Sequence, residues 1–293
     1  TRPAVLYVHG WVDYFFQTHL AKAVEQRGYR FYAVDLRGYG RSIGRSGNHA
    51  LPNYTSDLSV YAKDLDAAAK FIAQEEGHSR LVLMCHSTGG LIGPLWATTR
   101  PGRLAAMVLN SPWLDLNENW MMRFPVTWLI DVLGRIKPYG SFPTDRPFYG
   151  MALHQSTGGE WDYNLEWKPN QGFPIRFGWL REIRRAHRRV ARGLQVDCPV
   201  LVATSAKRGD NHHDHANVLT TDSILDPAQM WRRGKRLGPQ VEFIKIAGGA
   251  HDLALSPQPA RSQYLTSMLD WLDTTISAVD AAPTQNNNRS EVV

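Results

Sequence analysis

A serine stands between an apolar run and a pair of glycines in the stretch Leu81-Val-Leu-Met-Cys-His-Ser-Thr-Gly-Gly90. Four apolar residues before Cys85 are typical of a strand buried on both faces, and the glycines with the apolar residues after them predict the start of a helix. A sharp strand-to-helix turn needs small residues two before and two after its apex, and here these are Cys85 and Gly89. The pattern predicts that Ser87 is a nucleophile at such a turn. An ordinary turn between a strand and a helix is the alternative.

Strand and helix signals alternate on both sides of this turn. Apolar runs predict strands at 4–9, 30–36, 81–85, 104–110, 198–204 and 241–246. Amphipathic or capped segments predict helices at 16–27, 56–74, 89–99, 227–237 and 260–276, with Ser56 as a cap of the second. Such alternation predicts an α/β fold with a mostly parallel central sheet and helices on both faces.

The alternation stops at Ser111-Pro112 and resumes only at Cys198. The stretch between is rich in Pro and Gly and holds six of the ten tryptophans, namely Trp113, Trp120, Trp128, Trp161, Trp167 and Trp179. We therefore predict an inserted cap at 113–195 and a core made of 1–112 and 196–280. Residues 281–293 are polar and are predicted to form a disordered tail.

The bulk composition sets wide limits. With 43% apolar residues, the 293-residue chain can bury one large core. No run of apolar residues is long enough to span a membrane, and the first residues lack the layout of a signal peptide. The chain begins without Met, directly on a predicted strand, which is the pattern of a truncated N-terminus. The net charge of +6 favours anionic surfaces but is too diffuse to indicate nucleic acid.

The two cysteines, Cys85 and Cys198, are too few for a disulfide framework. Cys85 also lies in the predicted buried turn, so both are interpreted as free thiols. Free thiols favour a reducing compartment, and the expected location is the cytoplasm.

A serine hydroxyl needs a base, the base needs a carboxylate to fix its tautomer, and the developing oxyanion needs donors. On a parallel sheet these groups come from the carboxyl ends of strands. His251 follows the last predicted strand through a Gly-Gly-Ala turn and is predicted to be the base; a histidine satisfied within a surface loop is the alternative. His9 and His86 are too close to their strand ends to act as the base and are predicted to be structural.

The acid is expected after the strand that ends at Thr204. The candidates are Asp210, Asp214, Asp222 and Asp226. Asp222 is favoured because it lies at a loop end leading into a helix, whereas Asp226 precedes Pro227 as a helix N-cap does. Asp226 stays open as the alternative.

The run Asp210-Asn-His-His-Asp-His215 is rich in groups that bind zinc. Metal ligands usually come from a helix or from two separated pairs, however, and six contiguous loop residues are more typical of a solvated loop. We predict no metal and no organic cofactor.

Together these motifs resemble the α/β-hydrolase fold, and within it the branch of monoacylglycerol lipases, lysophospholipases and serine aminopeptidase (S33)-like proteins. The matching motifs are His9-Gly10, Asp35-Leu-Arg-Gly-Tyr-Gly-Arg-Ser42, the Ser87 turn, Asp222-Ser-Ile-Leu-Asp226 and Gly249-Ala-His251. They span nearly the whole chain outside the predicted cap. The resemblance implies the chain order Ser, Asp, His for the triad and an oxyanion hole built from the backbone N–H groups of Trp11 and Thr88. It also supports Asp222 as the acid.

Three features depart from the family pattern. Cys85 replaces the first glycine of the turn, residues 205–221 lengthen the loop that carries the acid, and the two leading strands expected before Ala4 are absent. None of these removes a member of the triad, but the long loop bears directly on the choice of acid.

The aromatic residues of the cap are expected to line an apolar pocket over Ser87; the alternative is that they form the core of the cap itself. Near the end of the cap, arginines recur at helical spacing, at Arg181, Arg184, Arg185, Arg188 and Arg192. An opposing apolar stripe contains Leu180, Ile183, His187, Val190 and Leu194. The cationic face predicts contact with an anionic membrane or an acidic ester, against the alternative of a solvated face.

The sequence therefore predicts a serine hydrolase that cleaves an apolar or lipid-like carboxylic ester through an acyl-enzyme. An S33-like aminopeptidase would need an acidic pocket, for which Glu160, Asp162 and Glu166 are the candidates. An acyltransferase and a non-catalytic binding module also stay open. Epoxide or haloalkane chemistry on this fold would need an aspartate nucleophile, which position 87 does not supply.

Overall fold

A computed structural model describes residues 2–45, 51–116, 120–144 and 147–281. Within these ranges the chain forms a six-stranded sheet with the strand order β2-β1-β3-β4-β7-β8. Its strands are β1 (Ala4–Val8), β2 (Arg30–Val34), β3 (Leu81–His86), β4 (Leu104–Asn110), β7 (Val200–Ser205) and β8 (Val241–Ile246). Every neighbouring pair is parallel, as the alternation of strands and helices predicts.

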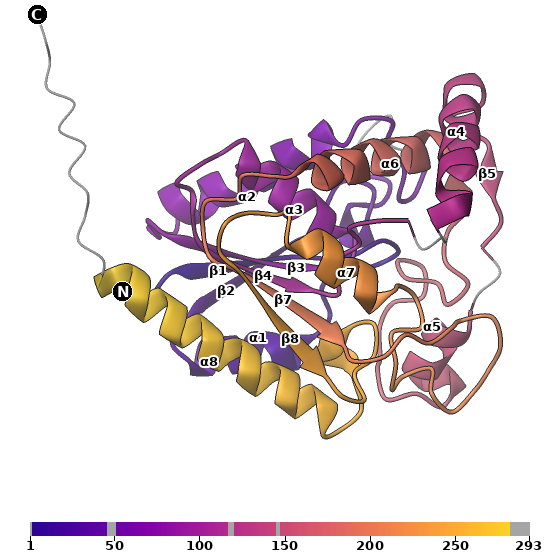
Figure 1. Cartoon of the computed structure of the whole chain (residues 1–293). Coiled ribbons are helices and arrows are strands. Elements are labelled where there is room, and N and C mark those ends of the chain that lie inside the picture. The colour runs from indigo at the N-terminus through magenta and orange to yellow at the C-terminus, as the bar shows by residue number, and fades with distance from the viewer. Residues whose placement is uncertain (1, 46–50, 117–119, 145–146, 282–293) are drawn as a thin grey trace, which may run out of the picture.

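Helices cover both faces of the sheet (Figure 1). On one face lie α1 (Thr18–Gln26) and α8 (Ala260–Ala281), and on the other α2 (Ser59–Gln74), α3 (Gly89–Thr98), α6 (Phe177–Arg192) and α7 (Pro227–Gly234). Alternate strand residues point to opposite faces, so β1 sends Leu6 into one apolar cluster and Tyr7 into the other. The α/β architecture predicted from the sequence is confirmed.

The described chain also contains three short 3-10 helices, η1 (Gly40–Ser42), η2 (Gln155–Thr157) and η3 (Leu253–Leu255). Three predicted helix ends were wrong, one of them the end of α7, which lies at Gly234 and not at residue 237. The second helix begins at Ser59, where the Asp57 carboxylate accepts the Ser59 N–H at 2.8 Å, so Ser56 is not its cap. The last helix extends to Ala281, and the remainder of the predicted tail, 282–293, lies outside the described residues.

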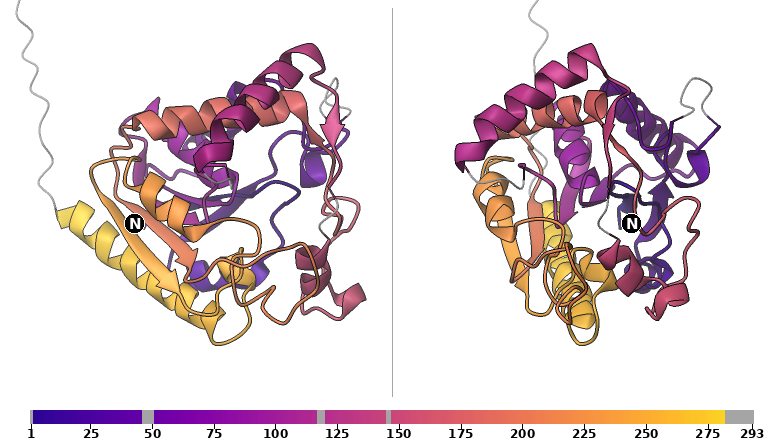
Figure 2. Two further views of the ribbon diagram at one scale, coloured as in Figure 1. Left: turned by 45° about the vertical axis from the view of Figure 1, so that its right-hand side comes forward. Right: turned by 90° about the vertical axis from the view of Figure 1, so that its right-hand side faces the viewer.

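The proposed cap, residues 113–195, contains α4 (Trp120–Ile136), β5 (Ser141–Phe142), α5 (Phe148–Leu153), η2, β6 (Ile175–Arg176) and α6. The two-residue strands β5 and β6 pair antiparallel. Figure 2 shows α4 crossing α6 on the side of the molecule toward which the strands run. Trp179 and Ile183 of α6 belong to the same buried cluster as Leu83 of the sheet, so the proposed cap shares the core on that face.

The predicted cationic face of α6 needs one correction. Arg184 is buried, with its Nη1 3.3 Å from Asp115 Oδ1 and 3.0 Å from His187 Nδ1. The guanidinium therefore belongs to an internal polar cluster, in which Arg233 also pairs with Asp115. Helical spacing alone cannot separate such an arginine from a solvated one, because a long side chain can turn inward when a carboxylate lies under the helix.

The neutral state of His187 makes a pH-dependent contribution to stability. Burial and the neighbouring Arg184 lower the pKa of His187 to about 3. Its Nε2 lies 2.9 Å from Trp113 O, so a neutral ring can donate there while Nδ1 accepts from Arg184. Unfolded chains bind this proton near pH 6.5, so the stability is complete above that pH and is lost as the pH falls toward 3.

We expect the free energy of unfolding to drop by about 2 kcal/mol from this group between pH 7.5 and pH 5. His187→Gln keeps a donor and an acceptor but does not titrate. The free energy of unfolding of this variant should therefore drop by about 2 kcal/mol less than that of the parent over the same interval. Chemical denaturation of both proteins at the two pH values measures the difference. Equal pH dependence in parent and variant would contradict the account.

Among the described residues, no helix combines the length and the apolarity needed to cross a bilayer. Cys85 and Cys198 are both buried free thiols.

Candidate active site

Ser87 lies at the turn between β3 and α3 with φ at +51°, the left-handed region that few residues other than glycine adopt. The turn brings its backbone against the end of β1. A Cβ on Gly89 would lie 2.6 Å from the carbonyl oxygens of Val8 and His9, so only glycine fits two residues after the serine. The small-residue rule used on the sequence thus has a direct steric cause.

Cys85, the departure from the family pattern, is accommodated by a second glycine. Its Sγ packs against α3 at Gly93, where an added Cβ would lie 2.6 Å from the sulfur. Burial raises the pKa of the Cys85 thiol far above its usual range, so this sulfur stays protonated. The substitution therefore fills space beneath the turn without adding a second nucleophile.

The structure brings Ser87, His251 and Asp222 together in one hydrogen-bonded chain. His251 Nε2 lies 3.0 Å from Ser87 Oγ, and His251 Nδ1 lies 2.9 Å from Asp222 Oδ1. All three side chains are buried, Asp222 completely. A carboxylate at Nδ1 fixes the tautomer in which Nε2 can accept a proton from the serine.

Asp222 is held in place by its own backbone. Asp222 N–H donates to Lys207 O at 2.9 Å and Gly209 N–H donates to Asp222 O at 2.8 Å, which closes the base of the long loop. Asp222 Oδ1 also accepts the N–H groups of Ile224 and Leu225 at 3.1 and 2.8 Å. These bonds hold the two ends of the long loop together, so Asp222 stays beside His251 although the loop is longer than in the family pattern.

The competing acids lie elsewhere. Asp226 is the N-cap of α7, as its position before Pro227 predicts, and accepts the Ala228 N–H at 3.0 Å. Asp210 accepts the His212 N–H at 3.1 Å within the histidine-rich loop, and Asp214 is exposed there. In the described part of the chain, no group of His, Cys, Asp or Glu side chains is arranged to hold a metal ion.

The two residues expected to form the oxyanion hole both border the cavity that contains Ser87. Thr88 directly precedes α3, so its N–H lies at the helix N-terminus, where amides have no partner within the helix. Trp11 belongs to the loop after β1. A Cβ on Gly10 would lie 3.0 Å from Ser87 Cβ, which places this loop against the serine.

His9 and His86 bond to the backbone. Leu36 N–H donates to His9 Nε2 at 3.0 Å, and His86 Nδ1 lies 3.3 Å from Asn110 O. Burial lowers the pKa of both rings, so they are neutral at physiological pH. Their contacts agree with structural roles.

A polar network behind His251 was missed by the sequence analysis. The buried carboxylate of Asp252 accepts Asn110 Nδ2 at 2.8 Å and Gln17 Nε2 at 2.9 Å. Asp252 N–H donates to the hydroxyl of Tyr149, a residue of the proposed cap, at 2.9 Å. The turn that carries His251 is thereby fixed from the sheet, from the start of α1 and from the cap. The one sequence feature that could have indicated this network is the polar residue Asn110 at the carboxyl end of a predicted apolar strand.

A cavity of about 590 Å³ contains Ser87 at its wall. Apolar side chains from α4, β5, β6 and α6 line one part of it, namely Val126, Leu129, Ile130, Phe142, Ile175, Trp179 and Leu180. Polar side chains line another part, namely Asp13, Tyr149, Tyr163, Lys168, Asn170 and Asn211. The cavity thus offers an apolar region and a polar region to a substrate bound at Ser87.

Of the six tryptophans expected to line this pocket, two do so, Trp113 and Trp179. Trp11, from the loop after β1, also lines it and stacks on Trp179 with 5.6 Å between the ring centroids. Trp128 is 63% exposed. Trp161 and Trp167 pack in a separate cluster beside Tyr14, and the side chain of Trp120 lies outside the described residues. The tryptophans of the proposed cap therefore fill both roles that the sequence left open: some line the pocket over Ser87 and others pack in a separate buried cluster.

Comparison with known proteins gives the family and the fold. Residues 1–258 match the family described as serine aminopeptidase, S33. The chain is 28% identical over 139 residues to a monoacylglycerol lipase of Mycolicibacterium smegmatis, covering 47% of this chain and 46% of that protein. It is also 33% identical over 119 residues to the bifunctional epoxide hydrolase 2 of Sus scrofa, covering 40% of this chain and 20% of that protein. The chain spans less than half the length of these curated relatives.

Solved structures show the same fold. The monoacylglycerol lipase of Paleococcus ferrophilus superposes with a TM-score of 0.67 at 21% identity, covering 92% of this chain and 94% of that one. A soluble variant of the monoglyceride lipase of Saccharomyces cerevisiae, in complex with a substrate analog, gives a TM-score of 0.69 at 19% identity, covering 94% and 87%. On the match over residues 1–258, the chain belongs to the serine aminopeptidase S33 family of α/β-hydrolases.

Proposed function

We propose that the protein is a serine hydrolase that cleaves carboxylic esters through an acyl-enzyme. The hydrogen-bonded chain from Ser87 Oγ through His251 to Asp222 Oδ1 is the observation that carries the proposal. Ser87 is the nucleophile, His251 the general base and acid, and Asp222 the residue that orients His251. The mechanism needs no metal or organic cofactor.

The reaction follows from these positions. Ser87 Oγ attacks the ester carbonyl carbon while His251 Nε2 takes its proton, and the N–H groups of Trp11 and Thr88 stabilise the oxyanion. His251 then gives the proton to the departing alcohol, which leaves the acyl group on Ser87. In the second half, water attacks the acyl carbonyl while His251 Nε2 takes its proton, and His251 then gives that proton to Ser87 Oγ as the carboxylic acid departs. An acceptor alcohol in place of water would make the same enzyme an acyltransferase.

The substrate class we propose is an apolar or lipid-like ester, such as a monoacylglycerol or a lysophospholipid. The apolar walls from α4 and α6 suit an acyl chain, and the polar wall beside Lys168 and Asn170 suits a hydroxylated alcohol group. Relatives described as monoacylglycerol lipases support this assignment.

Two competing chemistries have weaker support. An aminopeptidase would need a free acidic group for the substrate amine, but Glu160, Asp162 and Glu166 are absent from the described cavity wall. The two carboxylates on that wall are engaged: Asp13 pairs with Lys168, and Asp252 accepts the side-chain amides of Asn110 and Gln17. Epoxide hydrolysis, suggested by some relatives, would need a carboxylate nucleophile where Ser87 stands. A binding module without catalysis would not require a histidine aligned between serine and carboxylate.

Turnover of p-nitrophenyl esters from acetate to palmitate, beside aminoacyl p-nitroanilides, tests the substrate class. We expect ester hydrolysis with an optimum at a medium or long acyl chain and anilide cleavage at least about 100-fold slower, because each carboxylate on the described cavity wall already bonds to groups of the protein and is not free to take an ammonium group. Faster anilide cleavage would replace the esterase proposal with the aminopeptidase. A flat chain-length profile would contradict the acyl role of the apolar walls.

We also propose peripheral contact of the cap with an anionic membrane through α6, Arg181–Arg192. Arg185, Arg189 and Arg192 are exposed, although Arg184 is not available for this role. Neighbouring α4 exposes Trp128 and Leu129. Cosedimentation with phosphatidylglycerol vesicles should weaken with added salt and on reversal of the exposed arginine charges. Binding unchanged by both treatments would refute the contact.

The compartment we propose is the cytoplasm. Two buried free thiols, Cys85 and Cys198, suit a reducing environment.

A further inference from the structure

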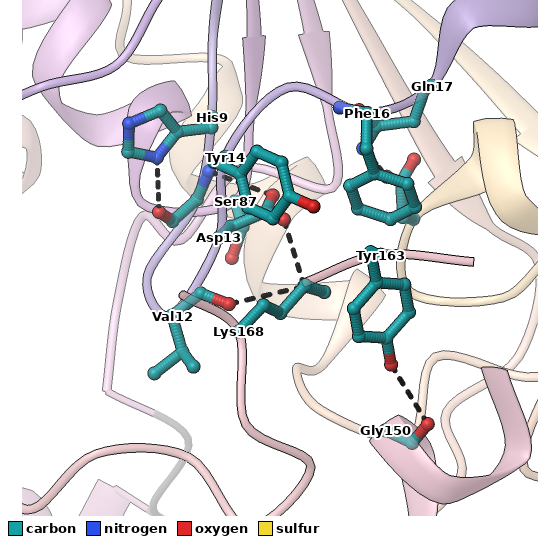
Figure 3. Close-up of polar contacts among 12 residues, drawn as sticks. His9, Val12, Asp13, Tyr14, Phe16, Gln17, Ser87, Gly150, Tyr163 and Lys168 are labelled. Carbon is teal, nitrogen blue, oxygen red and sulfur yellow. Dashed lines mark hydrogen bonds and ion pairs between the residues drawn. The ribbon is translucent and has the colours of Figure 1, made fainter. Parts of the chain in front are cut away.

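Lys168, which lies between η2 and β6 in the proposed cap, reaches the loop that carries Trp11 (Figure 3). Its Nζ lies 2.9 Å from Asp13 Oδ1 and 3.2 Å from Val12 O. The Asp13 side chain is 2% exposed and that of Lys168 is 15% exposed, so the ion pair is largely shielded from water. This contact joins the cap to the wall of the cavity beside Ser87.

The loop from Gly10 to Asp13 is held at both ends. Asp13 Oδ2 accepts the Gly10 N–H at 3.3 Å, so the carboxylate bridges the start of the loop and the ammonium of Lys168. Val12 has φ at +49°, which is unfavourable for a β-branched residue. The Val12 N–H donates to Asn53 Oδ1 at 2.6 Å, and its carbonyl is the second acceptor of Lys168. The Trp11 amide lies between these fixed points.

Stability alone does not account for such a contact. Removing two charges from water is unfavourable, and well-packed apolar residues often replace a buried ion pair without loss of stability. Burial by itself would raise the pKa of Asp13, but the ammonium of Lys168 beside it lowers that pKa overall, so the carboxylate remains charged. The rings of Phe16 and Tyr163 flank the ammonium, with centroids 5.8 and 5.7 Å from Nζ, within the range of cation–π contacts. The pair instead fixes the loop from Gly10 to Asp13, because the ammonium of Lys168 donates to Val12 O and the carboxylate of Asp13 accepts the Gly10 N–H.

We propose that Lys168 is a positioning residue for the oxyanion hole, which fixes the Val12 carbonyl and the Asp13 carboxylate and thereby holds the Trp11 N–H in place beside Ser87. The inference rests on the proposed ester hydrolysis. If Lys168 has this role, the oxyanion hole is complete only when the cap segment around Lys168 packs against the loop that carries Trp11. Loss of the lysine should affect the oxyanion more than it affects bound substrate.

The test compares Lys168→Met and Lys168→Arg with the parent on one p-nitrophenyl ester. We expect Lys168→Met to lower kcat by about 10- to 100-fold with KM changed less than about threefold, because a misplaced oxyanion donor acts in the transition state. Lys168→Arg retains donors for Val12 O and Asp13 and should recover most of the loss. Affinity for a trifluoromethyl ketone, which forms an oxyanion on Ser87, should fall with kcat, while affinity for the fatty-acid product should not.

A matched control is available in the cap. Glu160 pairs with Arg261 of α8 at 2.5 Å, a second ion pair between cap and core that does not touch the oxyanion loop. Glu160→Gln should leave kcat within about twofold of the parent. Asp13→Asn breaks the Lys168 pair from the core side and should lower kcat as Lys168→Met does, which provides a second variant if the methionine protein folds poorly.

The outcomes separate this inference from the proposed function. A parent protein that hydrolyses no ester removes the proposed function and the inference with it. An active parent with unchanged kcat in Lys168→Met, or with equal losses in Lys168→Met and Glu160→Gln, overturns the positioning role alone. A lower melting temperature with unchanged kcat and ketone affinity assigns Lys168 to cap stability and also overturns it.

Discussion

Replacing Ser87 by alanine is expected to lower kcat/KM for p-nitrophenyl esters by at least about 10⁴-fold, because the acyl-enzyme cannot form without the hydroxyl. The variant keeps a small side chain at a position where φ is +51° and where the turn packs against the end of β1. Its fold should therefore be unchanged by circular dichroism and thermal melting. Steady-state kinetics on both purified proteins gives the result.

Ser111 offers a matched control for this substitution. It is buried directly after β4 with φ at +47°, so Ser111→Ala makes the same chemical change at a neighbouring strand end in the same backbone conformation. We expect its kcat/KM to stay within about threefold of the parent, because the hydroxyl is not part of the triad. Ester hydrolysis retained in Ser87→Ala would end the serine mechanism.

The second large effect is expected at Asp222. Asp222→Asn should lower kcat by about 10³- to 10⁴-fold, because an amide can stabilise the wrong tautomer of His251 and cannot offset the imidazolium charge. Its oxygen can still accept the N–H groups of Ile224 and Leu225, so the loop should remain folded. Activity across pH at fixed ester concentration measures the loss.

Asp226→Asn is the control that decides between the two candidate acids. Asparagine is as good an N-cap as aspartate, so α7 should lose less than about 1 kcal/mol and kcat should stay within about twofold. The reverse pattern, a large loss at Asp226 and a small one at Asp222, would contradict the assignment of the acid.

Much of the fold was predictable because strands buried on both faces read as unbroken apolar runs. The β3 run and the glycines after it located the Ser87 turn, and the Gly-Gly-Ala sequence located His251 after the last strand. Asp222 was harder, since its position depends on a pairing between residues 207–209 and 222 across a long loop. Local sequence favoured it over Asp226 through the capping pattern before Pro227.

Contacts between distant segments could not be predicted in the same way. The bond between Asn110 and Asp252 joins positions 142 residues apart, and Lys168 meets Asp13 across 155. Arg184 has the same spacing as its exposed neighbours and differs only in the carboxylate beneath it. Such features depend on tertiary packing, which a single sequence records only as isolated polar residues.

Labelling with a fluorophosphonate tests the central claim most directly, since the reagent phosphonylates a serine activated by a neighbouring base. Intact mass and peptide mapping should find one adduct per chain, on Ser87, with ester hydrolysis falling to zero in proportion to the labelled fraction. Full ester hydrolysis in protein labelled completely at Ser87, or inactivation with the adduct on another residue, would contradict the account.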